Sequence, residues 1–417
     1  MSGIAMLAPF RTKSFRFQWP ADLFTAWALE METLILGWYV LVETGSVMLL
    51  TVFGSLQFVG TLISPMLGVL GDQLGLRNVL VVMRVCYTLF ASILLALALT
   101  KQLDPMVVLA VAALSGMVRP SDIGIRNALV GATVPPAHLI AAMGISRTTQ
   151  DSARVGGTLL GAAFMASFGM APAYMLITCI YFTGAILTIF VASGARVPTH
   201  QVGAMLAARP SPWRDLKEGL LYVWETPRLR AAISLAALVN LTAYPITSGL
   251  MPYIARSVFH LDQKGLGLLV ASFASGALIG SVTLSVLGSR VRPARTMMAT
   301  CIVWYLCIMG FTLTSNIAVA VMLLLIAGVA QSFSMVTLAI ILLRTSAEQF
   351  RGRIMGVRML AIYTLPLGLL IAGAAIPRLG FHATAMIFLL SGLLLTLQIA
   401  VTWRDDLIRR DAISNAG

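Results

Sequence analysis

Charged residues are scarce in this chain of 417 residues. Only 11% of the residues are Asp, Glu, Lys or Arg, whereas 59% are hydrophobic. A soluble globular chain carries about 25% charged residues, so the scarcity argues against a soluble protein. The apolar residues form runs of roughly 20, long enough for a helix to cross ~30 Å of hydrocarbon. They lack the short alternating segments of a transmembrane barrel. The composition therefore predicts an all-α integral membrane protein.

The sequence also lacks the common motifs of enzymes and metal sites. There are only four lysines and no Gly-x-x-x-x-Gly-Lys-[Ser/Thr] loop, which excludes this type of ATP-binding loop. Neither His-Glu-x-x-His nor Gly-x-Ser-x-Gly occurs. The four histidines lie in or beside predicted loops without metal-ligand spacing, and the four cysteines lie inside apolar runs. We therefore expect no enzyme activity, no cofactor, no bound metal and no disulfide framework.

The positive charge is unevenly placed along the chain. We predict twelve transmembrane helices, at residues 20–42, 46–70, 79–100, 106–131, 140–168, 173–194, 230–255, 265–288, 296–314, 317–343, 355–376 and 383–403. All but four of the 29 Lys and Arg residues fall on the side that holds both termini. Basic residues accumulate in cytoplasmic loops, so both termini are predicted to be cytoplasmic, in the inner membrane. The net charge of +13 is then explained by this topology and suits contact of the basic loops with anionic lipid headgroups. We therefore expect no nucleic-acid partner.

The chain divides into two halves around its longest polar connection. Residues 195–229 are rich in proline and charge, and they separate an N-terminal six-helix bundle, 1–194, from a C-terminal one, 230–417. The segment PWRDLKEGLLYVW within the connection has apolar residues at helical spacing and predicts an amphipathic helix on the cytoplasmic face. Residues 1–13 lack the character of a removable signal peptide, so the first span is expected to remain as an uncleaved signal.

The two halves resemble each other. A shift of 212 residues pairs Gly116 with Gly328, and the same shift pairs Gly156 with Gly368. The ordered pairs favour duplication of a six-helix unit. Such a repeat is typical of transporters that move one half against the other around a site at the membrane midplane.

The loop after the second span carries a recognisable pattern. In GVLGDQLGLR, Gly68, Asp72 and Gly75 have the spacing Gly-x-x-x-Asp-x-x-Gly, and Arg77 adds a basic residue. This pattern resembles the loop between spans two and three of the major facilitator superfamily. In that family the loop acts as a latch that holds the two halves together on the cytoplasmic side. A carboxylate placed at a helix N-terminus is stabilised by ~0.3–1 kcal/mol. The resemblance implies the same latch role for these four residues, against the alternative of a plain polar turn.

Nearly the whole chain shares this resemblance. The stretches GWYVLVETGS, LKEGLLYVWETPRLR and EQFRGRIMGV are similar to the branch with enterobactin-type siderophore exporters and macrolide-efflux proteins. The resemblance implies export of an amphiphilic small molecule such as a siderophore or a drug-like compound. We predict a secondary transporter that works by alternating access with protons as the coupling ion, and we expect a monomer. Import, or transport of a metal or metal complex, is the alternative within this class. A receptor or scaffold that transports nothing is the alternative from another class.

Two carboxylates lie near the middle of the first span. Glu30 and Glu32 are about 10 residues from its cytoplasmic end, which at ~1.5 Å per residue is close to the midplane. A charge at this depth costs ~2.5–3.5 kcal/mol, so an intramembrane ionisable residue is a functional candidate. Burial disfavours the charged form, which lets a glutamate exchange a proton near neutral pH. We predict proton coupling through one of them, with Glu30 preferred; a static partner for a buried Arg is the alternative.

Two further spans each carry an Arg-Asp-Arg series at helical spacing. The spacing allows ion pairs along one helix face, and together the two series predict a charge network or gate. Direct binding of an anionic substrate by Arg119 or Arg126 is a second interpretation. The two series are Arg119, Asp122 and Arg126 in span four and Arg147, Asp151 and Arg154 in span five.

The second half lacks these charges. The shift of 212 places Gln331 opposite Arg119. Span seven instead carries Asn240 and Tyr244 beside a kink at Pro245. We predict that Asn240, Tyr244 and Gln331 contact the substrate; ordinary hydrogen bonds between helices are the alternative.

Overall fold

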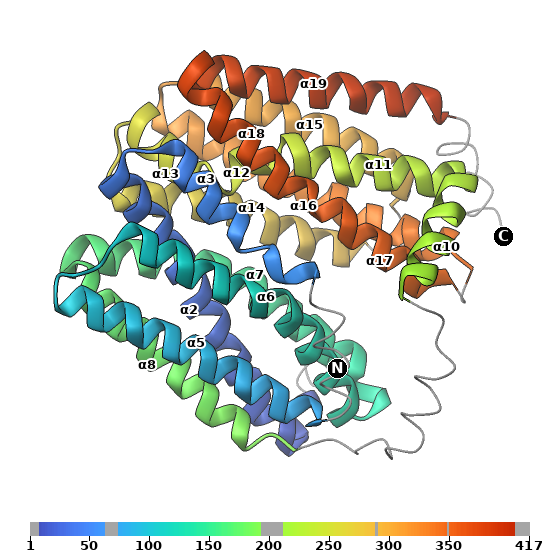
Figure 1. The fold of residues 1–417 in the computed structure, drawn as a ribbon. Coiled ribbons are helices and arrows are strands. Elements are labelled where there is room, and N and C mark those ends of the chain that lie inside the picture. Colours follow the sequence, from blue (N-terminus) through green and yellow to red (C-terminus); the bar gives the residue numbers. More distant parts are fainter. Residues whose placement is uncertain (1–7, 63–73, 193–211, 288–290, 348–349, 405–417) are drawn as a thin grey trace. The chain divides into compact units, whose positions relative to one another are not determined.

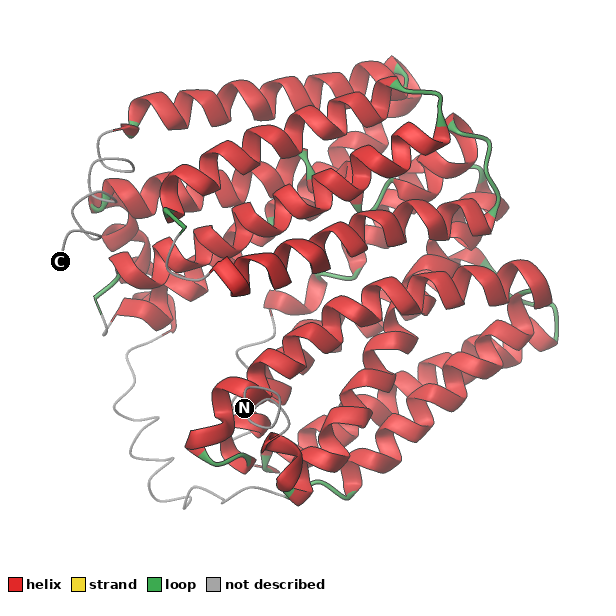
Figure 2. Ribbon diagram, turned by 180° about the vertical axis from the view of Figure 1, so that it is seen from behind, coloured by secondary structure: helices red, strands yellow, loops and turns green. Residues whose placement is uncertain are grey.

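The computed structural model describes residues 8–62, 74–192, 212–287, 291–347 and 350–404. Within these ranges the chain forms helices joined by short connections, with no strand (Figures 1 and 2). The chain forms two compact units. Unit 1 comprises residues 1–46, 56–209 and 261–267, and unit 2 comprises residues 47–55, 210–260 and 268–417.

Unit 1 is a helical bundle built around α2. This helix packs against α7 and α8, and α5 packs against α8. The helices of unit 1 are η1 Ala8–Arg11, α2 Lys13–Thr44, η2 Val59–Leu62, α5 Leu76–Leu99, α6 Pro105–Thr133, α7 Pro136–Phe168 and α8 Met170–Ile189.

Unit 2 is built around α11, which contacts α16, α17, α18 and α19, while α15 packs along α16. Its helices are α3 Val47–Leu56, α10 Pro212–Glu225, α11 Pro227–Thr242, α12 Tyr244–Thr247, α13 Met251–Tyr253, the π-helix η3 Ile254–Val258, α14 Gln263–Leu287, α15 Pro293–Leu313, α16 Ile317–Thr345, α17 Arg351–Ile362, α18 Thr364–Leu379 and α19 Phe381–Thr402. A few residues of α3 and α14 fall outside the unit's bounds.

The prediction of an all-helical membrane protein is confirmed. Nine of the twelve predicted spans coincide with described helices that are long and apolar enough to cross a membrane. The other three depart from a regular apolar helix in different ways. In the span 46–70, the structure describes α3 and η2, and the rest of the span lies outside the described residues. The span 140–168 falls within α7, a continuous helix of lower hydropathy. The seventh span is divided into α11, α12, α13 and η3.

The helix boundaries follow local sequence signals. Proline occupies the first turn of α6, α7, α11 and α15, where its missing N–H costs nothing. Asp104 caps α6 by accepting a hydrogen bond from the Met106 amide at 2.6 Å, and Asn316 caps α16 through the Ala318 amide at 2.9 Å. Left-handed glycines separate successive helices in both units: Gly169 between α7 and α8 has φ 83°, and Gly380 between α18 and α19 has φ 81°.

The glycines aligned by the internal repeat support equivalent close helix contacts. A Cβ on Gly116 of α6 would meet the Leu56 carbonyl oxygen at 2.1 Å, and one on Gly328 of α16 would meet the Phe273 carbonyl oxygen at 2.1 Å. Neither backbone could approach so closely with any larger residue. The two units therefore share a packing feature, as a duplicated unit requires.

The predicted amphipathic helix in the connection corresponds to α10, which packs on the start of α17. Glu218 of α10 accepts a hydrogen bond at 2.9 Å from Arg214 of the same helix and forms an ion pair at 2.9 Å with Arg353 of α17. The Tyr222 ring stacks on Phe350 with centroids 4.4 Å apart. Two of the stretches that carry the family resemblance are thus in contact within unit 2.

Candidate functional site

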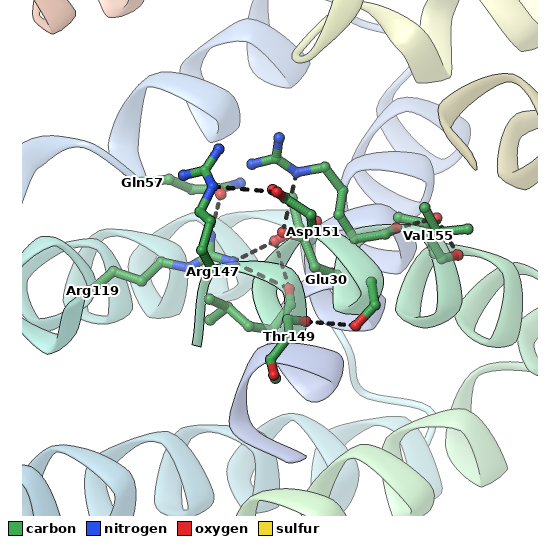
Figure 3. Close-up of polar contacts among 12 residues, drawn as sticks. Glu30, Gln57, Arg119, Arg147, Thr149, Asp151 and Val155 are labelled. Atoms are coloured by element: carbon green, nitrogen blue, oxygen red, sulfur yellow. Dashed lines mark hydrogen bonds and ion pairs between the residues drawn. The ribbon is translucent and has the colours of Figure 1, made fainter. Parts of the chain in front are cut away.

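The two carboxylates of α2 have different surroundings. Glu32 is buried, 8% exposed, and accepts a hydrogen bond at 2.8 Å from the hydroxyl of Tyr181 on α8. The side chain of Glu30 is 27% exposed, and its Oε1 lies 3.6 Å from Nε of Arg154 on α7 (Figure 3). Positions two residues apart point to nearly opposite sides of a helix, so α2 places one carboxylate inside the unit and the other at a partly exposed position.

Arg119 links three segments of unit 1 (Figure 3). Its guanidinium donates to the side-chain oxygen of Gln57, to the hydroxyl of Thr33 at 2.7 Å and to the carbonyl oxygen of Leu29 at 3.1 Å. The last two lie on α2, close in sequence to Glu30. The sequence spacing had allowed Arg119 to pair with Asp122, but in the described residues it bonds to α2 instead.

The charges on α7 follow the predicted pattern more closely. Arg147 and Asp151 form the expected ion pair four residues apart, at 3.2 Å (Figure 3). Arg154 reaches across to Glu30 on α2. Trp19 on α2 donates to the Thr149 hydroxyl at 2.9 Å, which further ties these two helices together. The charged side chains of Glu30, Arg147 and Asp151 therefore lie close to that of Arg119 (Figure 3).

A second charge cluster is buried in unit 1; the helical spacing had indicated Arg126 as a candidate, but not Asp22 or Arg84. Arg84 on α5 is fully buried and donates to Asp22 on α2 and to the hydroxyl of Thr188 on α8. Arg126 on α6 lies with Nε 3.9 Å from the second carboxylate oxygen of Asp22. The other α6 pairing allowed by the spacing, Asp122 with Arg126, is not formed among the described contacts. The cost of charges in spans one and three would have identified Asp22 and Arg84.

The predicted residues of unit 2 are only partly brought together. Gln331 on α16 donates to the hydroxyl of Tyr244 on α12 at 2.6 Å, and the Tyr244 ring contacts Trp304 edge-on, with centroids 5.1 Å apart. Asn240 donates instead to the Ala236 carbonyl of its own helix at 2.8 Å. Tyr244 and Gln331 thus form a neutral polar contact inside an aromatic environment.

The structure describes only part of the loop that carries the family pattern. Gly68 and Asp72 lie outside the described residues. Gly75 precedes α5 with φ 88°, a backbone conformation that favours glycine. Arg77 donates to the Asn78 side chain at 3.0 Å and to the Val191 carbonyl at 3.5 Å. The latch role of these four residues remains a prediction. Among the described residues, no group of three or more metal-ligating side chains is close enough to hold an ion.

Sequence comparison identifies the family. The model of the Major Facilitator Superfamily matches residues 21–365 and again residues 233–414, so the chain belongs to this superfamily. It is therefore a secondary transporter with multiple membrane spans, in a family of transporters rather than enzymes, and its substrate is a small molecule.

Several curated relatives are efflux proteins. Macrolide efflux protein A of Streptococcus pyogenes is 22% identical over 395 residues, which covers 90% of this chain and 94% of that protein. Multidrug efflux pump Tap of Mycolicibacterium fortuitum is 27% identical over 381 residues, covering 86% and 88%. The expected resemblance to macrolide-efflux proteins is thereby confirmed at the level of distant similarity.

Solved structures confirm the fold. The nucleoside transporter NupG aligns with a TM-score of 0.70 at 13% identity, covering 93% of this chain and 99% of that one. A bacterial homologue of the iron transporter ferroportin aligns with a TM-score of 0.71 at 17% identity, covering 93% and 98%. At this identity the likeness concerns the fold alone.

Proposed function

We propose that this transporter exports an amphiphilic small molecule in exchange for protons, by alternating access. The observation that carries the proposal is Glu30: a partly exposed carboxylate, in a charge-poor membrane helix, whose ion-pair partner comes from another helix. The efflux relatives support outward transport of a drug-like or siderophore-like compound. Glu32, buried against Tyr181, is the second candidate for the coupling carboxylate.

The ion pair of Glu30 with Arg154 can be broken at little cost. An ion pair between partly exposed groups is worth only ~0–1 kcal/mol, so Arg154 can be released at little cost when a proton neutralises Glu30. Arg119 is anchored to the same stretch of α2 through Thr33 and Leu29. Protonation of one carboxylate would then change the charge balance among α2, α6 and α7, which is the kind of local electrostatic event that biases a two-state transporter.

Transport by purified protein in liposomes tests this proposal. Erythromycin, enterobactin and ethidium serve as macrolide, siderophore and dye probes, and an internal pH dye reports proton movement under an imposed pH gradient. We expect a probe to move against its gradient in exchange for protons, and Glu30→Gln or Glu32→Gln to abolish the coupling. Glu43→Gln, on an exposed residue of the same helix, is the matched control and should transport normally.

Other outcomes of the same assay decide against the proposal. Accumulation of a probe in the direction opposite to export would identify an importer. Movement of a probe that does not depend on the pH gradient would indicate facilitated diffusion. Binding without movement of any probe, with both glutamine variants active in binding, would favour a receptor or scaffold.

The proposed transporter has a defined orientation in the membrane and two bundles that move against each other. Both termini face the cytoplasm, the protein acts as a monomer in the cytoplasmic membrane, and residues 1–194 and 230–417 act as the two bundles. The excess of basic residues on the side of the termini supports the orientation. Labelling of single cysteines placed near each terminus, by a reagent that does not cross the membrane, should occur only after the cells are opened.

We also propose that the loop after the second span acts as a latch. Asp72 holds the bundles together on the cytoplasmic side, assisted by Gly68, Gly75 and Arg77. Asp72→Asn should raise the accessibility of cysteines placed on the cytoplasmic side, whereas Asp104→Asn, at the exposed start of α6, should leave it unchanged.

A further inference from the structure

One face of α10 is apolar and exposed. With 14 residues, this helix is too short to cross a membrane. Leu220, Leu221 and Trp224 are nevertheless 45%, 52% and 71% exposed, and the exposed Lys217 lies one turn before them. Because residues at positions i, i+3, i+4 and i+7 share one side of a helix, these four form a single surface, here called the α10 face. A row of exposed apolar side chains marks a surface that contacts a membrane or another molecule.

The other side of α10 is fixed to unit 2. Glu218 forms its ion pair with Arg353, and the Tyr222 ring stacks on Phe350. Gly219 is buried so closely that a Cβ on it would meet the Cβ of Arg353 at 3.2 Å. These contacts set the rotation of α10 about its axis, so the α10 face points away from α17 and stays exposed.

Arg230 connects the α10 face to the end of α19. Its guanidinium carbon lies 5.5 Å from the centre of the Trp224 ring and 5.3 Å from the centre of the Trp403 ring. Cations at this distance are attracted to an indole ring. Arg230 lies near the start of α11, and Trp403 is the C-cap of α19. Three helices therefore meet at the end of unit 2 that carries α10 (Figure 1).

The positive charge of Arg230 has no counter-charge among the described residues. It forms no ion pair there, and its Nε is buried without a hydrogen bond. Indole rings attract the cation but leave the five N–H donors of the guanidinium, whose geometry matches a phosphate, unsatisfied. Lys217 and Arg404 are exposed and add positive charge. Glu225, the acid next to Trp224, is exposed and pairs with none of them in the described part of the chain.

Trp403 indicates where the membrane surface lies. It follows directly on α19, an apolar span with exposed Leu394 and, near its end, Val401, which are 63% and 76% exposed. Tryptophan is enriched where a span meets the lipid headgroups. Since Arg230 contacts both tryptophan rings, the α10 face lies close to the level at which α19 leaves the membrane.

We propose that the α10 face binds an anionic phospholipid, with Arg230 as the ligand of the lipid phosphate and the apolar side chains of Leu220, Leu221 and Trp224 against the acyl chains. A helix with one apolar face and basic residues lies in the plane of the membrane surface in this way. The unbalanced charge of Arg230 and Lys217 selects an anionic headgroup over a neutral one. Only the choice of leaflet, the cytoplasmic one, rests on the proposed function.

Binding of single lipids to the purified full chain tests the headgroup. Native mass spectrometry compares dioleoyl phosphatidylglycerol with dioleoyl phosphatidylcholine, which have the same acyl chains. We expect phosphatidylglycerol to bind more tightly, and Arg230→Gln to weaken its binding roughly tenfold, the effect of losing a hydrogen bond to a charged group. Arg214→Gln is the matched control, because it removes the same charge from an exposed side chain of α10 that already pairs with Glu218, and it should bind as the wild type does.

Two results of this measurement would overturn the proposal. One is equal affinity for the two lipids. The other is an Arg230→Gln variant that binds phosphatidylglycerol as tightly as the wild type.

A second measurement covers the case in which Arg230→Gln does not fold. Leu221→Cys and Glu225→Cys, each in a chain whose four native cysteines are replaced, carry a nitroxide spin label in vesicles of phosphatidylglycerol and phosphatidylcholine. Oxygen concentrates in lipid, whereas a nickel chelate stays in water. The label at 221 should collide mainly with oxygen, and the control label at 225, outside the α10 face, mainly with the chelate.

The same labels report any other occupant of the α10 face. A label at 221 that collides mainly with the chelate would show a face in water. A label at 221 shielded from both reagents would show a face covered by protein, either another segment of this chain or a second copy. Both results would overturn the proposal. Neither measurement uses a transported compound or a proton gradient, so failure here and failure of the proposed function are distinguishable.

Discussion

The interiors of the two units differ in charge although they share packing features. Unit 1 buries Asp22, Glu32, Arg84, Asp122 and Arg126 among its helices. In the described part of unit 2, the buried polar side chains are uncharged, for example Asn240, Thr242 and Ser334. The glycine contacts of α6 and α16 and the left-handed glycines before α8 and α19 are nevertheless equivalent.

This difference indicates which features a duplicated unit must keep, the close helix contacts, and which it can change, the buried charges. Close backbone contacts define the path of the helices, so the glycines that allow them recur in both units. Buried charges do not define the path of a helix, and each needs a partner in its own unit to offset the cost of leaving water. The units can therefore diverge in chemistry while retaining one architecture, with the ionisable groups concentrated in unit 1.

The largest expected effect comes from breaking the buried ion pair of unit 1. Arg84→Gln leaves Asp22 buried without its hydrogen-bonded cation, which should lower the free energy of unfolding by ~3–5 kcal/mol. Unfolding in mixed micelles with increasing dodecyl sulfate measures it. Because the double variant Asp22→Asn/Arg84→Gln removes both charges, it should be less destabilised than the sum of the single variants.

Unit 2 offers a matched control for this prediction. Glu218→Gln breaks the partly exposed ion pair with Arg353 and should cost only ~0–1 kcal/mol. Equal losses for Arg84→Gln and Glu218→Gln would show that burial of charge does not distinguish the two units.

The shared glycine contacts predict equal effects in the two units. Gly116→Ala and Gly328→Ala each place a Cβ against a backbone carbonyl oxygen, so each should cost ~1–3 kcal/mol in the same unfolding assay. Gly124→Ala, on α6 with open space at its Cβ, should be neutral or stabilising. Clear destabilisation by only one of the first two variants would argue against equivalent helix contacts.

The smallest expected difference comes from two buried tyrosines. Tyr181 donates to the carboxylate of Glu32, whereas Tyr305 shares a bond with the hydroxyl of Thr242. A hydrogen bond to a charged group is worth ~1.5–3 kcal/mol and a neutral one ~0.5–1.5 kcal/mol, so Tyr181→Phe should destabilise more than Tyr305→Phe. Thermal unfolding of the two variants in detergent compares them, and equal losses would mean that Glu32 is uncharged in the folded protein.

The fold was largely predictable because its signals are local. Long apolar runs predict the helices, prolines and capping residues predict where several begin, and the pattern that includes Gly75 and Arg77 indicated the superfamily. The seventh span was less predictable. Pro245 and Pro252 interrupt it, and the sequence alone indicates a kink but not a division into α11, α12, α13 and η3.

The partners of the buried charges were less predictable. Helical spacing allowed Arg119 to pair with Asp122, yet Arg119 bonds to Gln57 and Thr33. The pair of Arg147 and Asp151 was predicted correctly because both residues lie on one helix, four residues apart. Contacts between helices depend on the rotation of each helix about its axis, which the sequence of one helix does not specify.

By itself, the sequence determined that this protein is a helical transporter of the Major Facilitator Superfamily and that ionisable groups occur on the long apolar helices of its first half. Only the tertiary structure decided which charges meet. It buries Asp22 with Arg84, leaves Asp122 without a hydrogen-bond donor on Oδ1 and separates Glu30 from Glu32. The physical reason is that transfer into a membrane depends on composition and local spacing, whereas pairing of charges depends on which helix faces pack together.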